Sequence, residues 1–268
     1  MDLAEEVIDF YMIIDEERNE DYRVDCLSLI ASMLKQHQVN IDFWTRNPCF
    51  GTLCDNLVFD ADQDNPNVRF FACKCLYKLS ERLNGKELKD FIVDSPLPLI
   101  MIGQFRSPGS HSLVMLRTLI NLGVRFPEKL SELVLKNELF LILVSLLREE
   151  DYSISLKLVL SLMTFTVKDA ADNPELAEYL VDNMDCLRAV YLLIRENGKE
   201  GLMEEIAELL FWLFSLGETI RLRSQTNPFV QQVELHAELG EMVDRARSHD
   251  SSSVSLKFQN LIESFFYS

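Results

Sequence analysis

The sequence contains little glycine and little proline. There are nine glycines and eight prolines in 268 residues, and these are the residues that tight turns between strands need. Their scarcity disfavours a fold built from many β-hairpins. Because apolar residues make up 48% of the chain, it can still bury a sizeable interior and is not disordered. The composition therefore favours a folded, helical protein.

Positive charge is scarce as well. Lys and Arg number 26 against 43 Asp and Glu, which gives a formal net charge of −17. Nucleic acids and anionic membranes both attract positive surfaces, so we expect neither as a direct partner. The most apolar run, residues 139–147, is nine residues long, far short of the roughly 20 that a membrane-spanning helix needs.

Signals for secretion and disulfide formation are also missing. The first residues, MDLAEEVIDF, are acidic where a secretory signal would be basic. The six cysteines are therefore expected to be reduced side chains that fill space in a cytoplasmic or nuclear protein. They are Cys26, Cys49, Cys54, Cys73, Cys75 and Cys186.

The sequence lacks the motifs of common catalytic, cofactor and metal sites. It has no Gly-x-Ser-x-Gly and no glycine-rich phosphate loop, and its four histidines form no His-Glu-x-x-His. Cys73 and Cys75 are two residues apart, which directs them to different faces of a helix instead of to one metal ion. We expect no enzymatic activity, no cofactor and no metal.

One helical pattern recurs along the whole chain. A first residue is followed by apolar residues four, eight and eleven positions later, which is the spacing of one helix face. In one copy the pattern reads Val68, Ala72, Leu76 and Leu79. The copies begin at Tyr22, Val68, His111, Ile154, Glu205 and Val254. Intervals of 43 to 51 residues between them fit a repeat of two or three helices.

Further helices are expected between these long ones. A second apolar helix is predicted within each interval, at residues 50–59, 97–105, 139–148, 186–195 and 233–246. Short first helices are predicted to begin at Pro127 and Pro174, because proline followed by an acidic residue suits the first turn of a helix. A turn at residues 136–137 is predicted to separate a first helix from a second.

The order of short helix, helix, polar break and long helix resembles the armadillo family. Residues 127–147 resemble the first and second helices of that family's repeat, and residues 113–123 resemble its third helix. The resemblance implies an all-α fold, a right-handed α-solenoid of about six armadillo-like repeats. It covers residues 1–268 as a single domain, and the first repeat lacks its opening helix.

The resemblance also implies where a partner would bind, because the third helices of armadillo arrays line a concave groove that captures extended peptides. In nuclear-import adaptors of this fold, each third helix presents a Trp and, four residues later, an Asn. The corresponding pairs here are Ser28 and Ser32, Lys74 and Lys78, Arg117 and Asn121, Leu160 and Thr164, Phe211 and Ser215, and Asn260 and Ser264. Only Asn121 matches, so we do not expect an import adaptor for basic signals.

The side chains at these positions suggest a different partner. Lys74 and Lys78 share a helix face and would lie beside Arg117 of the next repeat, where they would attract an acidic or amphipathic protein segment. Asn121 and Thr164 would hold its backbone. The candidate groove comprises Lys74, Lys78, Arg117, Asn121, Leu160, Thr164 and Phe211. Alternatively, the long basic side chains only cover apolar helix surface and keep their charges in water.

The end helices form a second candidate surface. The last helix is apolar around much of its circumference, and its candidate interface comprises Leu256, Leu261, Phe265 and Phe266. The first helix, residues 3–14, is similarly broad. Either end can form the seam of a homodimer or of a larger assembly. Alternatively, the first and last helices fold back and cap the array.

These features predict a non-enzymatic, protein-binding scaffold or adaptor. The alternative is an armadillo-type co-chaperone, a nucleotide-exchange factor that grips a heat-shock chaperone. The two are distinguished by whether the chain changes the nucleotide off-rate of such a chaperone.

Overall fold

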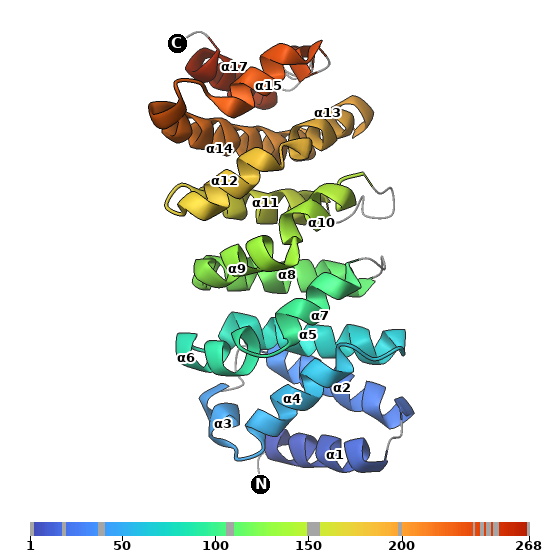
Figure 1. The fold of residues 1–268 in the computed structure, drawn as a ribbon. Helices are drawn as coiled ribbons and strands as arrows, with labels where there is room; N and C mark the ends of the chain where they lie inside the picture. Colours follow the sequence, from blue (N-terminus) through green and yellow to red (C-terminus); the bar gives the residue numbers. More distant parts are fainter. Residues whose placement is uncertain are drawn as a thin grey trace. The chain divides into compact units, whose positions relative to one another are not determined.

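The computed structural model describes residues 3–17, 20–36, 41–105, 110–148, 156–197, 200–237, 239–241, 244, 248 and 252–266. The secondary-structure elements in these ranges are all helices (Figure 1). They fall into two compact units, Met1–Lys129 and Leu130–Ser268. Within the described ranges, no helix combines the length and the apolar character that crossing a membrane requires.

The N-terminal unit holds the first helices in chain order. They are α1 (Leu3–Glu17), α2 (Glu20–Lys35), α3 (Ile41–Arg46), α4 (Phe50–Asp60), α5 (Pro66–Arg82), α6 (Gly85–Leu88), the π-helical turn η1 (Lys89–Val93), α7 (Leu97–Gln104) and α8 (Ser110–Arg125). Helix α9 (Pro127–Asn137) spans the border between the units.

The C-terminal unit continues the same order of short and long helices. It contains α10 (Leu139–Leu146), α11 (Leu156–Ala170), α12 (Pro174–Asp182), α13 (Asp185–Asn197), α14 (Glu200–Ser224), α15 (Pro228–Leu235) and α17 (Ser252–Phe265).

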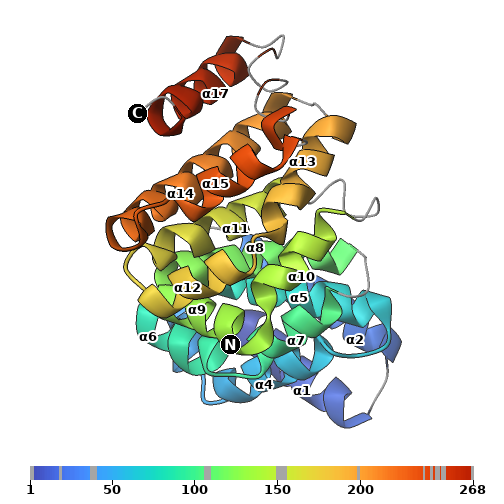
Figure 2. The same ribbon diagram turned by 45° about the horizontal axis from the view of Figure 1, so that its top comes forward.

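The six predicted long helices are present as α2, α5, α8, α11, α14 and α17. In the N-terminal unit α5 packs against both α2 and α8, and in the C-terminal unit α14 packs against both α11 and α17 (Figures 1 and 2). The four predicted core positions of α5 are buried, namely Val68, Ala72, Leu76 and Leu79. Each long helix therefore buries its apolar face against its neighbours in the manner of a helical repeat.

Three of the helices begin with the same pair of residues, Asn followed by Pro. In α5, α12 and α15 the side chain of Asn65, Asn173 or Asn227 accepts backbone N–H groups of the first turn, and Pro occupies the first helical position. The cap satisfies N–H groups that have no partner within the helix, and Pro has no N–H to satisfy there.

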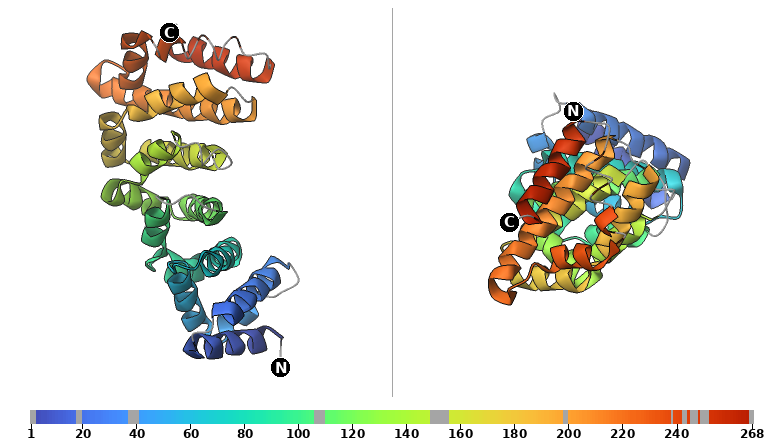
Figure 3. Two further views of the ribbon diagram at one scale, coloured as in Figure 1. Left: turned by 90° about the vertical axis from the view of Figure 1, so that its right-hand side faces the viewer. Right: turned by 90° about the horizontal axis from the view of Figure 1, so that it is seen from above.

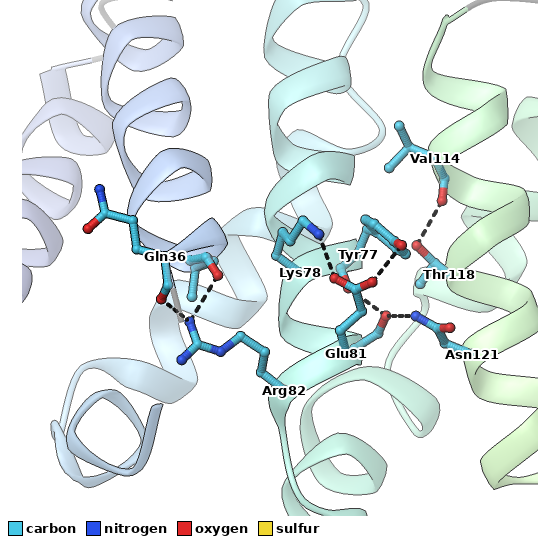
Figure 4. Close-up of polar contacts among 10 residues, drawn as sticks. Gln36, Tyr77, Lys78, Glu81, Arg82, Val114, Thr118 and Asn121 are labelled. Atoms are coloured by element: carbon cyan, nitrogen blue, oxygen red, sulfur yellow. Dashed lines mark hydrogen bonds and ion pairs between the residues drawn. The ribbon is translucent and has the colours of Figure 1, made fainter. Parts of the chain in front are cut away.

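Two arginines connect the ends of neighbouring long helices. Arg82 of α5 donates hydrogen bonds to the carbonyl oxygens of Leu34 (2.9 Å) and Gln36 (3.2 Å) at the end of α2 (Figure 4). Arg125 of α8 donates to the carbonyls of Ser80 (3.0 Å) and Leu83 (2.7 Å) at the end of α5. Each guanidinium supplies donors and positive charge where a helix leaves carbonyls unpaired.

Two predicted boundaries are wrong. The second helix expected at residues 233–246 does not begin at Val233, because α15 ends at Leu235 and His236 is extended; with its Asn-Pro start, α15 instead matches a first helix. The turn expected at residues 136–137 lies one residue later. Helix α9 continues through Asn137, and the chain changes direction at Glu138, whose φ of 57° is left-handed.

Candidate functional site

The candidate groove residues of the N-terminal unit lie on α5 and α8. Lys74 of α5 is half-buried, and its Nζ lies 5.8 Å from the ring centre of Phe70 and 5.6 Å from that of Phe71. A cation over aromatic rings is attracted by their negative faces. Arg117 of α8 is exposed. Neither Lys74 nor Arg117 has an ion-pair partner among the residues that the structure describes.

Lys78 is engaged with a carboxylate on its own helix. Its Nζ lies 2.6 Å from Glu81 Oε2, while the Tyr77 hydroxyl donates to Glu81 Oε1 at 2.6 Å (Figure 4). Burial alone would raise the pKa of Glu81, but the hydrogen bonds from Lys78 and Tyr77 and the charges of Lys78 and Arg117 lower it below its ordinary value. Glu81 is therefore ionised at neutral pH and neutralises Lys78.

Burial also raises the pKa of Tyr77, and its hydrogen bond to Glu81 and the negative charge of that carboxylate raise it further. Tyr77 and Glu81 were not predicted as site residues. A Glu three residues after a Lys on one helix face is a signal that could have revealed the pair.

Asn121 links two helices. Its side-chain N–H donates to Ser80 Oγ at 3.1 Å, across the contact between α8 and α5 (Figure 4). The amide carries a second N–H and a carbonyl oxygen, so this bond leaves hydrogen-bonding capacity. In the N-terminal unit, the sequence-predicted residues Lys74, Lys78, Arg117 and Asn121 thus lie on adjacent helices, and Glu81 reduces their positive charge.

Two predicted groove positions of the C-terminal unit are wrong. Leu160 and Thr164 of α11 are buried, so their side chains cannot line an open groove. The buried residues of α11 include Val159, Met163 and Thr166. Each lies one position after a residue that the pattern beginning at Ile154 assigned to the buried face.

The one-residue shift identifies the α11 positions that are accessible. The half-exposed residues that correspond to Lys74 and Lys78 are Ser161 and Phe165. Lys168 extends this surface, since its Nζ lies 4.9 Å from the ring centre of Trp212 and 2.8 Å from Glu208 Oε1.

Phe211, the remaining predicted groove residue, borders a hollow between α14 and α17. Its side chain is 42% exposed, and its ring meets those of Trp212 and Phe265 edge-on at 5.8 Å. The hollow has a volume of about 370 Å³ and is lined by Ala207, Glu208, Phe211, Lys257, Asn260, Leu261 and Ser264. It is large enough for an apolar side chain of a partner.

The candidate end interface on α17 is mostly used within the chain. Leu261 is buried, and the half-buried rings of Phe265 and Phe266 pack edge-on against Phe214 of α14 at 5.7 and 5.6 Å. Leu256 remains 58% exposed. The prediction of an open interface is therefore wrong for Leu261, and α17 caps its own unit with most of its apolar face.

The cysteines are free thiols, and all but Cys49 are buried. Burial raises the pKa of Cys54, Cys73 and Cys186 to about 12 in each case. Since the thiolate is the reactive form, these side chains act as packing groups. The described residues contain no cluster of three or more His, Cys, Asp or Glu that could hold a metal ion.

Known structures resemble this chain over its whole length. An engineered protein matches it with a TM-score of 0.71 and 16% sequence identity, covering 100% of both chains. Computationally designed armadillo repeat proteins for modular peptide recognition match with a TM-score of 0.71 and 13% identity, over 98% of this chain and 99% of theirs. A designed armadillo repeat protein in complex with the peptide (KR)4 matches with a TM-score of 0.68 and 12% identity, over 98% of this chain and 100% of its own.

No protein-family model matches the sequence, and no curated protein matches it. At these identities the structural likeness shows the fold alone. The chain has an armadillo-like helical repeat fold, of the all-α solenoid class that the sequence predicted.

Proposed function

We propose that this protein is a non-enzymatic scaffold that binds an acidic or amphipathic segment of a partner protein on the α5–α8 surface. The observation that carries the proposal is the pair of cations Lys74 and Arg117, on adjacent long helices, which form no ion pair with any described carboxylate. Designed proteins of the same fold recognise peptides, one of them the basic peptide (KR)4. The cations of the α5–α8 surface favour a segment of opposite charge.

The usual spacing of packed helices suits an extended segment. Packed helices lie about 10 Å apart, while a polyproline-II chain advances about 9 Å over three residues and returns to the same face. Carboxylates at every third position would therefore match Lys74 and Arg117. The half-buried rings of Phe70 and Phe71 below Lys74 would contact the apolar residues of such a segment.

The test uses two labelled peptides of identical composition, one with Glu at every third position and one with the same Glu residues gathered at one end. Fluorescence anisotropy at low ionic strength measures their affinities for the full chain. We expect the peptide with spaced Glu residues to bind more tightly than the other. Lys74→Glu or Arg117→Glu should lower the affinity for this peptide by about tenfold, as for a direct charge pair.

The matched control is Lys86→Glu, which makes the same charge change at an exposed position on α6. Its affinity should remain close to that of the parent protein. Unchanged affinity in both Lys74→Glu and Arg117→Glu would refute the proposed site on the α5–α8 surface.

We further propose a cytoplasmic or nuclear location, because free buried thiols suit a reducing compartment. The co-chaperone alternative stays a prediction, tested by the rate of nucleotide release from a heat-shock chaperone with and without the chain. A homodimer through an end helix also stays a prediction.

A further inference from the structure

The outer face of α1 combines two carboxylates with two large apolar side chains. Among the residues of α1 whose side chains the structure describes, the exposed ones are Glu6, Asp9, Phe10 and Ile13. They fall on one stripe because residues three, four and seven apart share a helix face. Phe10 is 52% exposed and Ile13 is 53% exposed. These side chains stand one turn apart and form a short apolar ridge.

The opposite face of α1 fixes this ridge in place. Val7, Ile8 and Tyr11 are buried, and α1 packs against α2 and α4 at the edge of the N-terminal unit (Figure 3). The Tyr11 hydroxyl donates to Asp60 Oδ2 of α4 at 2.5 Å. The helix therefore cannot turn to bury Phe10 and Ile13 without breaking this packing.

The exposed ridge departs from the usual pattern of a surface helix, whose outward side carries charged and polar residues. Apolar side chains that stay exposed between charged ones are typical of a protein-binding surface.

The charge of α1 decides what kind of molecule can cover the ridge. The helix contains no Lys or Arg, and its acidic residues are Glu5, Glu6, Asp9, Asp15, Glu16 and Glu17. In a symmetric dimer, a second copy would place the same acidic surface against itself, and like charges across an interface oppose association. An anionic membrane would be repelled for the same reason.

We propose that the outer face of α1 binds a basic amphipathic helix of a partner protein. Apolar residues of that helix, spaced three and four apart, would pack on Phe10 and Ile13 in the manner of two crossing helices. Its Lys or Arg residues would pair with Glu6 and Asp9. This surface does not rest on the proposed α5–α8 site, because it lies on a different helix and selects the opposite charge.

The test uses a labelled peptide with Leu at positions that share one helix face and Lys at the others, together with a scrambled peptide of the same composition. Anisotropy measures binding of each to the full chain at low and at physiological salt. We expect the double variant Phe10→Ser, Ile13→Ser to bind the peptide with Leu on one face about tenfold more weakly or worse, as truncation of central apolar contacts does. The double variant Glu6→Gln, Asp9→Asn should also lower the affinity for this peptide and reduce the dependence of that affinity on salt.

Two controls separate this site from general attraction to an acidic protein. Leu99→Ser removes an apolar side chain of similar exposure, 52%, from α7, and Asp172→Asn combined with Glu178→Gln removes two exposed carboxylates from the C-terminal unit. Both should bind like the parent, and circular dichroism melts should show that all variants fold.

Equal binding by every variant, or equal binding of the scrambled peptide, would overturn the proposal. Sedimentation could instead show a dimer that the double variant Phe10→Ser, Ile13→Ser dissociates. That result would overturn the proposal, because the ridge would then bind a second copy of this chain.

Discussion

A buried carboxylate connects three helices of the N-terminal unit. Asp60 of α4 accepts the Tyr11 hydroxyl of α1, and Arg23 Nε of α2 lies 3.0 Å from both of its oxygens. Burial raises the pKa of Asp60, although the hydrogen bond from Tyr11 and the charge of Arg23 oppose the rise. Removing a charge from water is costly unless partners replace the water, so each partner of Asp60 stabilises the contact of its own helix.

We expect Tyr11→Phe to lower the free energy of unfolding of the N-terminal unit by about 1–3 kcal/mol, because it leaves a buried carboxylate with one donor fewer. Urea denaturation followed by circular dichroism measures the change.

Tyr179→Phe is the matched control. Its buried hydroxyl has no hydrogen-bond partner among the described residues, so removing it should leave stability unchanged or raise it slightly. Equal losses in the two variants would show that the bond to Asp60 contributes nothing specific.

The single-residue roles were the hardest to predict from sequence. Asp60 stands at the end of an apolar helix, and nothing local indicates that Tyr11 and Arg23 meet it from other helices. The assignment of Lys78 to the groove stays a prediction, and its ion pair with Glu81 was missed. Local charge patterns reveal a pair on one helix, whereas contacts across helices depend on packing that the pattern does not encode.

At the scale of the helix, the apolar pattern predicted α5 well and α11 poorly. In α5 charged and aromatic residues separate the core positions, so only one face is apolar enough to be buried. The sequence of α11, LKLVLSLMTFTVKDA, is apolar on nearly every side. When leucines occur at alternate positions, several faces fit the pattern, and the surrounding packing selects among them. The mistaken placement of Leu160 and Thr164 followed from this ambiguity.

The arginines at the ends of α5 and α8 show what a repeat comparison could still have found. Arg82 and Arg125 are 43 residues apart, the same interval as the pattern starts Val68 and His111. Basic residues in the last turn of a helix are favourable for that helix itself, which is why their bonds to the preceding long helix were not expected.

The start of α15 allows a matched test of helix capping. Asn227 accepts the N–H groups of Phe229 and Val230 and also donates to the Phe214 carbonyl (2.9 Å) and to Glu218 (2.8 Å). A side chain at Gly217 would collide with it, since a Cβ there would lie 1.9 Å from Asn227 Oδ1.

We expect Asn227→Ala to destabilise the C-terminal unit by about 2 kcal/mol or more, because it removes the cap and leaves the Phe214 carbonyl without this donor. Asn173→Ala, which removes a cap with a single accepted N–H, from Leu176, should cost about 1 kcal/mol. Thermal melts of the two variants compare them directly, and equal losses would mean that the α14–α15 link adds no stability.

At the scale of the whole molecule, stability should vary along the chain. Each long helix packs mainly against its neighbours within a unit, and repeat arrays approximate a sum of local contributions and nearest-neighbour interfaces. A single repeat domain over residues 1–268 stays a prediction, because the chain divides into two compact units.

Hydrogen exchange of two core variants tests this expectation. Leu76→Ala in α5 and Leu213→Ala in α14 each remove a fully buried side chain and should cost about 2–5 kcal/mol. We expect the first to increase exchange chiefly in α2, α5 and α8, and the second chiefly in α11, α14 and α17. An equal increase throughout the chain in both variants would instead indicate one cooperative domain.

The burial of the cysteines has a practical consequence for identifying partners. Thiol reagents attack the thiolate, and five of the six native thiols are buried. A cysteine introduced at the exposed position of Arg117 or Phe10 would therefore react ahead of these five, with Cys49 the one native thiol to replace first. Photocrosslinkers attached at these two positions could then label, in the same cell extract, the molecules that approach α8 and those that approach α1.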